Sequence, residues 1–448
     1  MPAEATVERN HSSLNSLGRR EIIFAAPVLL SLLVLFTSPN FQSSRASSLR
    51  AGPATASAAT FAPLGSDFLQ EWTGGYIWLS QQRSELYSAD HFKQIQHDPN
   101  IVGFSWSESK FYPMVYPPFY YMLVSPLALL PYQLAMSLWI VAIGLTLGLT
   151  VFVWCKYFPP AERHWGKCLI ASLAFYPILM CFNTAHKSIL LLLILTSTFL
   201  LLHHRRSFSA GAIFGLIAFK PHLAILIGVA MLLKRQWQFV LGAIASAGTL
   251  VALSFVAGPD LCSDYFQQCL AFGDYSSNAG YQISESHTLL SALQLTVDKA
   301  SLPALYYMLA GTGVLFVIVA LYWILRGTLE TNSTRFRLQF SALVIATVLL
   351  SPHLYTYDLA ILLLPIGLIM FALDSLRKRS TTDKRGRRER VLPMLCLALF
   401  ASAGISTKLA AGLHFQLTLA VMLGLLIAIA SVARTLFLSS EHFEVGGQ

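Results

Sequence analysis

Residues 188–202 read SILLLLILTSTFLLL, and the next five residues, 203–207, read HHRRS. The first stretch has no charged residue and is almost wholly aliphatic, which is typical of a helix surrounded by lipid. The second stretch is a cationic turn, after which apolar residues resume at Phe208. Because cationic loops stay on the cytoplasmic side of a membrane, this pattern predicts a chain that crosses the bilayer repeatedly.

The composition of the 448 residues agrees with this prediction. Hydrophobic residues make up 55% of the chain and charged residues 12%, with a mean hydropathy of +0.58. An ordinary soluble domain carries about 25% charged residues. These values exclude a soluble enzyme, a disordered chain and a disulfide-stapled secreted domain. In a membrane protein the formal charge of +9 reports sidedness first, so we expect the lipid bilayer, and no nucleic acid, as a partner.

Apolar runs define the expected membrane helices. The first, Ile22–Ser38, has no small-residue cleavage site behind it, so we interpret it as a helix and not as a signal peptide. Tyr116–Leu130 is a further short helix that either crosses or re-enters. The chain is therefore predicted to be all-α and polytopic, with about 12 membrane helices, one or two more or fewer. The later runs lie at 133–155, 168–182, 188–202, 208–219, 221–233, 238–257, 303–325, 338–351, 357–373, 391–407 and 411–433.

Basic residues orient the chain. They gather in 156–167, 203–207, 234–237, 326–337 and 377–390, the last of which holds eight Lys and Arg. We interpret that run as a topology anchor in preference to an anionic-lipid site. The positive-inside rule then predicts a cytoplasmic N-terminus at 1–21, one transmembrane domain over 22–437 and a cytoplasmic tail at 438–448. The outer loops are 39–116, expected to carry membrane-surface helices, and 258–301.

The six cysteines do not form a metal-binding pattern. Cys262 and Cys269 share the outer loop 258–301, where a disulfide and a pair of free thiols are both open alternatives. The others lie in or near the spans and are expected to act as small hydrophobic residues: Cys155, Cys168, Cys181 and Cys396.

Ionisable residues at the ends of spans are costly, so each is a candidate functional residue. Asp67 lies in an outer segment, GSDFLQEW at 65–72, with Trp72 close behind. It is either an N-cap or early-turn residue of a helix, or a carboxylate base held near the membrane surface. Tyr116 precedes two prolines that fix the start of a helix, and alone it is more typical of an interfacial anchor.

The turn 183–188, NTAHKS, joins two spans and contains Asn183, His186 and Lys187. The turn is either part of a functional site or an interfacial turn whose lysine reaches water.

Two further outer segments contain ionisable groups. Lys220 and His222 flank Pro221 between two short apolar segments, where a broken helix would present the ammonium to a cavity. Residues 351–358, SPHLYTYD, place His353, Tyr357 and Asp358 between two spans, where they form either a ligand site or a satisfied interfacial network.

These outer groups pair one acidic side chain with a set of cations. Asp67 could accept a proton from an attacking hydroxyl. The cations Lys187, Lys220 and His353, with His186 and His222, could stabilise charge growing on a leaving phosphate. No dense carboxylate cluster suggests a divalent metal, and no Gly-rich phosphate loop suggests a nucleotide. We therefore expect phosphate-directed group transfer without a metal or another cofactor.

The order of these motifs resembles glycosyltransferase family 87, the polyprenyl-phosphate-mannose-dependent mannosyltransferases of bacteria. The resemblance covers about residues 65 to 375. It begins with the outer Asp-Phe followed by a Trp, and continues through Tyr-Pro-Pro and an Asn-headed turn before an apolar helix. Its most specific parts are Phe219-Lys220-Pro221, Ser351-Pro352-His353 and Tyr357-Asp358.

The resemblance implies a GT-C fold with the active site on the outer face of a bacterial plasma membrane. It implies inverting transfer of a hexose, mannose first among the candidates, from a polyprenyl-phosphate donor to a glycolipid or envelope glycan acceptor, without a metal. Asp67 would be the catalytic base, and Lys220, His353 and Lys187 would contact the donor phosphate. The other expected substrate contacts are Asp358, Tyr357, Tyr116, Trp72, Asn183, His186 and His222.

One segment departs from the family pattern. The usual Asn-Gly-Gln before the helix at 188 is replaced by the sequence of residues 183–187, which adds a cation. Because of this departure, the sequence does not determine the sugar or the acceptor. A degenerate, non-catalytic member of the family is a further alternative. Two other classes also remain: a polyprenyl-linked glycan transporter or flippase, although no inverted repeat is seen, and a glycan polymerase or ligase. Tyr281–Leu293, with Glu285-Ser286-His287, is a further candidate acceptor-side element.

Overall fold

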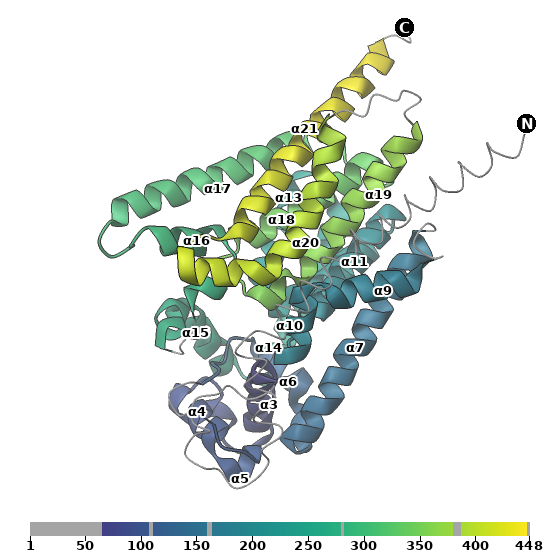
Figure 1. The fold of residues 1–448 in the computed structure, drawn as a ribbon. Helices are drawn as coiled ribbons and strands as arrows, with labels where there is room; N and C mark the ends of the chain where they lie inside the picture. The colour runs from purple at the N-terminus through teal and green to yellow at the C-terminus, as the bar shows by residue number, and fades with distance from the viewer. Residues whose placement is uncertain (1–64, 107–110, 159–163, 279–281, 380–386, 446–448) are drawn as a thin grey trace, which may run out of the picture.

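The computed structural model describes residues 65–106, 111–158, 164–278, 282–379 and 387–445 (Figure 1). Within these ranges the regular secondary structure is helical, and one isolated bridge joins Ser286 to Tyr355. The predicted all-α class is therefore confirmed for this part of the chain. The predicted N-terminal segment 1–21 and first span, Ile22–Ser38, lie outside the described residues.

Among the described residues, six helical stretches are long and apolar enough to cross a membrane. A seventh candidate is the pair α9 (Trp165–Ala174) and α10 (Tyr176–Thr184), which is bent by 69°. Shorter apolar helices follow the predicted runs as well. They are α6–η3 (Pro118–Leu129), α11 (Ser188–His203), α12–η4 (Ser207–Phe219) and α13 (Pro221–Leu233). The six long stretches are α7 (Tyr132–Tyr157), α14 (Trp237–Ala257), α17 (Pro303–Leu325), Thr356–Leu376, Val391–Leu413 and Leu417–Arg434.

The long helices expose large apolar side chains. On α7, Leu145 is 71% exposed, and at the end of α14, Val256 is 85% exposed. Water-soluble monomers rarely expose contiguous apolar surface of this kind, whereas a helix that faces lipid does so at no cost. Length, composition and exposure together indicate a membrane protein.

The centre of the bundle is buried on all sides. Helix α18 (Thr334–Leu350) buries every residue from Leu338 to Leu349, and α11 buries most of its length. Both helices belong to the main hydrophobic core cluster, in which α18 packs against α19 (Leu363–Arg379), α21 (Leu417–Val445), α13 and α17. This core connects to the segments that carry the candidate site residues, because η6 (Thr356–Leu362) directly precedes α19.

Helices α12 and α14 approach each other very closely. A Cβ atom added at Gly211 would lie 1.9 Å from the carbonyl oxygen of Phe239, and one at Gly242 would lie 2.1 Å from that of Phe208. Small residues allow apolar helices to pack through their backbones when no hydrophobic effect drives association. This contact fixes α12, and therefore the position at which η4 delivers Lys220 to the start of α13.

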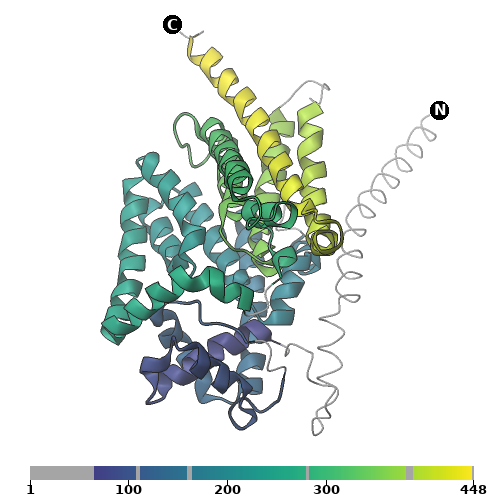
Figure 2. The same ribbon diagram turned by 90° about the vertical axis from the view of Figure 1, so that its left-hand side faces the viewer.

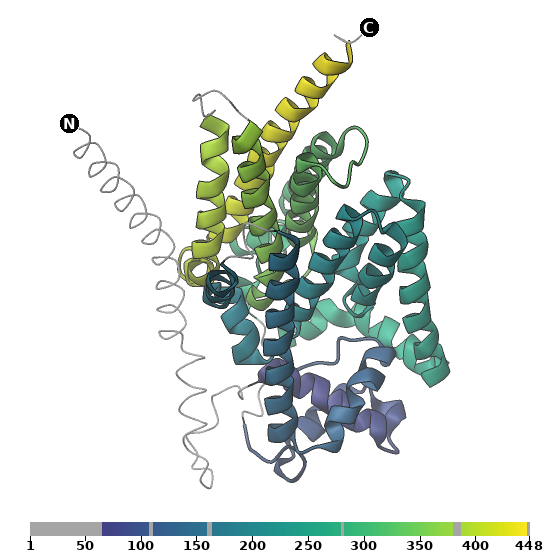
Figure 3. The ribbon, with the colours of Figure 1, turned by 90° about the vertical axis from the view of Figure 1, so that its right-hand side faces the viewer.

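The first outer loop folds into helices at one end of the bundle. They are α3 (Ser66–Leu79), η2 (Arg83–Glu85), α4 (Ala89–His97) and α5 (Pro99–Val102). Figures 2 and 3 show this group at the end of α7 that lies farthest from the C-terminus. Most of α3 is buried, because it packs against α6, η3 and α4. Whether these helices lie on a membrane surface stays a prediction.

The second outer loop contains α15 (Pro259–Asn278), η5 (Ile283–Glu285) and α16 (Leu289–Thr296). Cys262 and Cys269 both lie on α15, and both are free thiols. Seven helical residues separate their Cα atoms by about 10 Å, whereas a disulfide needs at most about 7 Å. The disulfide alternative is therefore wrong, and the pair of free thiols is correct.

Two predicted boundaries also shift. The run 168–182 is broken at Phe175, because Pro177 begins a new helix there. The run 411–433 begins too early, because α20 (Arg387–Leu413) ends before His414, whose φ of 55° stops the helix. Helix α21 continues to Val445, and the end of the transmembrane domain at 437 stays a prediction.

Candidate functional site

A cavity of about 1240 Å³ lies where the first outer loop meets the bundle. Its walls come from α3, the segment 114–116, the η4–α13 junction, α15, the 283–300 region and the 352–358 turn. Residues that are far apart in the sequence therefore share one space. The predicted site residues that line it are Asp67, Tyr116, Lys220, His222, His353, Tyr357 and Asp358.

Asp67 reaches the cavity from the first turn of α3. The helix begins after Gly65, which has a left-handed φ of 71°. The Gly65 N–H donates to the carbonyl of Asn183 at 3.2 Å, and the Tyr132 hydroxyl donates to the Gly65 carbonyl at 3.0 Å. These bonds fix the start of the helix, so Asp67 is an early-turn residue and Gly65 is the N-cap.

The environment of Asp67 brings the pKa of its carboxyl close to neutral pH. Burial raises its pKa to about 7, while a hydrogen bond with Thr184 and the charges of Lys187 and Lys220 act in the opposite direction. Its Oδ2 atom is buried and has no hydrogen-bond partner among the described residues. A general base works best when its pKa lies close to the operating pH. Asp67 is therefore a candidate general base, with a pKa near neutrality and one buried oxygen that no described residue contacts through a hydrogen bond.

Lys220 stands at the predicted break between two helices. It is the N-cap of α13, Pro221 is the first helical residue, and η4 ends immediately before it. Its ammonium donates to Asp358 Oδ1 at 2.7 Å and lies 3.3 Å from His186 Nε2. The ion pair is nearly buried but retains contact with the cavity, because both partners line it.

A chain of polar contacts surrounds that ion pair. Ser188 donates its hydroxyl proton to Asp358, and its Oγ atom lies 2.9 Å from His186 Nδ1. The Ser188 backbone N–H also donates to His186 Nδ1, at 3.2 Å, so both ring nitrogens of His186 face a donor. The His186 ring also stacks on Tyr357, with centroids 3.9 Å apart. The 186–188 turn thus orients both members of the ion pair.

His353 and His222 complete this wall of the cavity. Burial lowers the pKa of His353 to about 3, so its ring is neutral at pH 7. His353 therefore offers a hydrogen bond and not a charge, in contrast to the cationic role expected from the sequence. The His353 ring contacts the Tyr355 ring edge-on, with the two ring centroids 4.4 Å apart.

Lys187 lies behind the wall and is not among the residues that line the cavity. It pairs with Glu71, and its ammonium sits 3.5 Å from the ring centroid of Tyr116. Glu71 was not singled out by the sequence analysis. The available signal was its position four residues after Asp67, which places both carboxyl groups on one face of a helix.

Trp72 and Asn183 also lie away from the cavity lining. The Trp72 indole donates to the carbonyl of Leu130 at 3.1 Å and packs in a separate hydrophobic cluster. The backbone carbonyl of Asn183 holds Gly65. Both residues therefore position α3.

The rest of the lining includes neutral polar side chains, together with the charged residues Asp298 and Lys299. Ser286, Ser291 and Gln294 are among the neutral ones, together with Gln268 and Cys269 of α15. The described part of the candidate element Tyr281–Leu293 contributes Ile283, Ser286 and Ser291 to the cavity. His287 is instead buried, and its Nε2 atom is hydrogen-bonded to the Thr356 hydroxyl at 3.0 Å.

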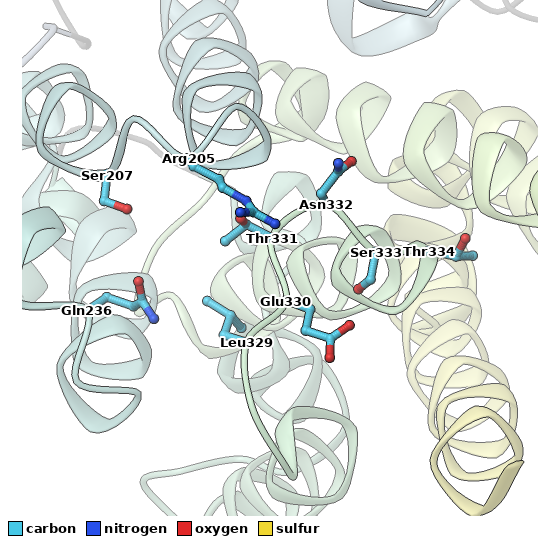
Figure 4. Close-up of a pocket in the computed structure, with 9 residues that line it drawn as sticks. All are labelled: Arg205, Ser207, Gln236, Leu329, Glu330, Thr331, Asn332, Ser333 and Thr334. Atoms are coloured by element: carbon cyan, nitrogen blue, oxygen red, sulfur yellow. The ribbon is translucent and has the colours of Figure 1, made fainter. Parts of the chain in front are cut away.

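A second cavity, of about 660 Å³, lies at the far end of α12 and α13 (Figure 4). It is lined by the turns at 205–207 and 236 and by residues 329–334, and none of the predicted site residues lies there. Within the described part of the chain, no three His, Cys, Asp or Glu side chains gather in a way that could hold a metal ion.

Comparison with known proteins identifies the family of the chain. The model of glycosyltransferase family 87 matches residues 114–352, just over half of the chain. That range contains Tyr116, the 183–188 turn and Lys220, and it ends one residue before His353. No curated protein and no solved structure matches the chain. The extent of the family match shows that the chain belongs to glycosyltransferase family 87.

Proposed function

We propose that this glycosyltransferase moves a hexose, with mannose as the first candidate, from a polyprenyl-phosphate donor to a hydroxyl of a glycolipid or envelope glycan. One observation carries the proposal: Asp67, with its unpartnered oxygen, and Lys220, with its ammonium, line the same cavity. A base and a phosphate-directed cation are what this transfer needs at its two ends.

In the proposed reaction the acceptor hydroxyl oxygen attacks the anomeric carbon from the face opposite the phosphate. Asp67 takes the hydroxyl proton as the new C–O bond forms. The bond from the anomeric carbon to the phosphate oxygen breaks, and polyprenyl phosphate leaves with the electron pair. Lys220 stabilises the charge on that leaving group, and His353 donates a hydrogen bond to it. In-line displacement inverts the anomeric configuration.

The remaining residues take supporting roles in this proposal. Asp358 holds the Lys220 ammonium, and His186 and Tyr357 fix the geometry of that pair. Tyr116 and His222 line the cavity and contact the substrates. Lys187, Trp72 and Asn183 act from behind the wall, on the position of α3 and of the 183–188 turn.

We further propose that the molecule has the GT-C architecture, with about 12 membrane helices. The apolar helices of the described residues, together with the Ile22–Ser38 run, supply enough segments for that count. The cavity would then open at the outer face of a bacterial plasma membrane, because the basic turn at 203–207 lies at the opposite end of α12 from Lys220.

The test uses membranes or purified protein with a polyprenyl-phosphate-linked hexose. Asp67→Asn should reduce transfer at least about 100-fold, the lower end of what a general base contributes. Asp90→Asn, on the exposed surface of α4, is the matched control and should keep the wild-type rate. Full transfer by Asp67→Asn at equal protein level would remove Asp67 as the base. Lipid scrambling in liposomes without transfer, or products much heavier than a single-sugar adduct, would instead favour a flippase or a polymerase.

A further inference from the structure

A second buried ion pair lies directly behind the cavity wall. Glu71 and Lys187 are 0% and 1% exposed, and they pair across 116 residues of sequence. The other Glu71 oxygen accepts a hydrogen bond from the Tyr120 hydroxyl at 2.8 Å. The ammonium lies 3.5 Å from the ring centroid of Tyr116 and 4.5 Å from that of Tyr120.

Stability alone does not explain such a pair. Two charges lose their hydration on burial, and well-packed apolar residues of similar size are often as stabilising or more so. The location supplies a better reason. Glu71 lies one helical turn after Asp67, and Lys187 is the neighbour of His186, which contacts Lys220. The pair thus connects the helix of the proposed base to the turn that orients the proposed phosphate cation.

We propose that Glu71 and Lys187 form a positioning pair for Asp67, which fixes α3 against the 183–188 turn and balances the charge around the base. The inference rests on the proposed function, in which Asp67 accepts the proton. Neither residue touches the substrate in this arrangement, because neither lines the cavity.

The two members act on Asp67 in opposite directions. The positive charge of Lys187 lowers the pKa of Asp67, and the negative charge of Glu71 raises it. The acidic and basic side chains that act on Asp67 are these two and Lys220. The other titratable side chains around it, on the elements packed against α3, are Tyr112, Tyr116, Tyr132, Cys181 and Tyr355.

The experiment follows kcat/KM for sugar transfer against pH in Lys187→Gln, Glu71→Gln and the double variant. Lys187→Gln should move the acid limb to higher pH and Glu71→Gln to lower pH, each by on the order of half a unit. The double variant should fall between them, because both charges are gone and the two amides can still hydrogen-bond. Lys93→Gln and Glu85→Gln remove exposed charges from the same outer loop and should leave the limb unmoved.

A single variant that leaves one buried charge unpaired can fail to fold, so melting temperatures accompany every profile. In that case the double variant decides. Lys187 acts on Asp67 more strongly than Glu71 does, so the acid limb of the double variant should still move to higher pH. In that variant kcat should be reduced more than KM is raised. If kcat/KM is lower in all folded variants but the acid limb stays at the wild-type pH, the pair contributes only to stability, and the inference is overturned. A wild type without transfer, or an active Asp67→Asn, would instead overturn the proposed function.

Discussion

The ammonium of Lys220 lies 2.7 Å from a carboxylate oxygen of Asp358, a residue 138 positions further along the chain. The pair joins the break between η4 and α13 to the turn that begins η6. Lys220 is thereby held on its inner side, while it also lines the cavity. A cation bound in this way is ready for an anionic ligand without rearrangement, which is the form of preorganisation that electrostatic stabilisation requires.

Breaking this pair should cost both stability and rate. Asp358→Asn leaves the Lys220 ammonium without a counter-charge, a change that typically costs about 3–5 kcal/mol for a buried pair. We expect a lower melting temperature in detergent and transfer reduced at least about tenfold, since 1.4 kcal/mol of lost stabilisation already gives that factor. The double variant Lys220→Met/Asp358→Asn should recover most of the melting temperature but none of the transfer. A single variant with wild-type melting and rate would contradict the role given to Asp358.

Asp67 should reduce the stability of the fold as the pH rises. Its pKa is about 7 in the folded protein against an ordinary value of 3.8. Between these two pH values the folded carboxyl binds a proton that the unfolded chain has released, so the free energy of unfolding falls as pH increases. Asp67→Asn removes this loss, which amounts to a few kcal/mol at most. Its melting temperature should therefore exceed that of the wild type by an amount that grows from about pH 4 to about pH 7. A difference that is constant with pH would show that Asp67 is ionised throughout.

Two glycines of α14 provide a matched pair for the helix contact. A Cβ at Gly242 would meet the carbonyl oxygen of Phe208 at 2.1 Å, whereas one at Gly248 would meet nothing within 4 Å. Gly242→Ala should destabilise the protein by about 1–3 kcal/mol and lower the transfer rate, because α12 leads through η4 to Lys220. Gly248→Ala should keep or slightly raise the melting temperature. Equal behaviour of the two variants would mean that the α12–α14 contact does not constrain the site.

Cys269 offers a test of both sidedness and occupancy. It is exposed and lines the cavity, whereas Cys262 is half-buried. A membrane-impermeant maleimide applied to intact cells with a permeable cell wall should label the wild type and not Cys269→Ser. A polyprenyl-phosphate donor should slow the labelling of purified protein. Labelling only after the membrane is opened would place the cavity on the cytoplasmic side.

The sequence predicted the helical class and pointed to several residues that line one cavity, for identifiable reasons. Apolar runs such as 188–202 have a single stable form in lipid, so α11 follows from composition. The cost of ionisable groups at span ends pointed to Asp67, Lys220 and His353, which share the cavity.

Contacts between distant segments could not be predicted in the same way. The partner of a buried charge is decided by three-dimensional packing, and nothing in the local sequence joins Lys187 to Glu71 across 116 residues. For the same reason the sequence pattern suggests that Lys187 meets the donor phosphate, whereas its ammonium lies against the Tyr116 ring and outside the cavity lining. The loop helix α15 was not foreseen, so the alternative of a disulfide within 258–301 stayed open until both thiols were found on one helix.

The six residues from Asn183 to Ser188 contact both α3 and the Lys220–Asp358 pair. The first holds Gly65, Lys187 holds Glu71, and His186 and Ser188 hold Lys220 and Asp358. A mutation in this hexapeptide is therefore felt simultaneously by the α3 side and by the α13 side. Substitutions in this hexapeptide must preserve contacts with both Glu71 and Asp358. Residues 183–188 should therefore change only together with compensating changes at positions 71 or 358. In a saturation mutagenesis screen, second-site suppressors of variants in residues 183–188 should accordingly map to α3 and η6, the helices that contain positions 71 and 358.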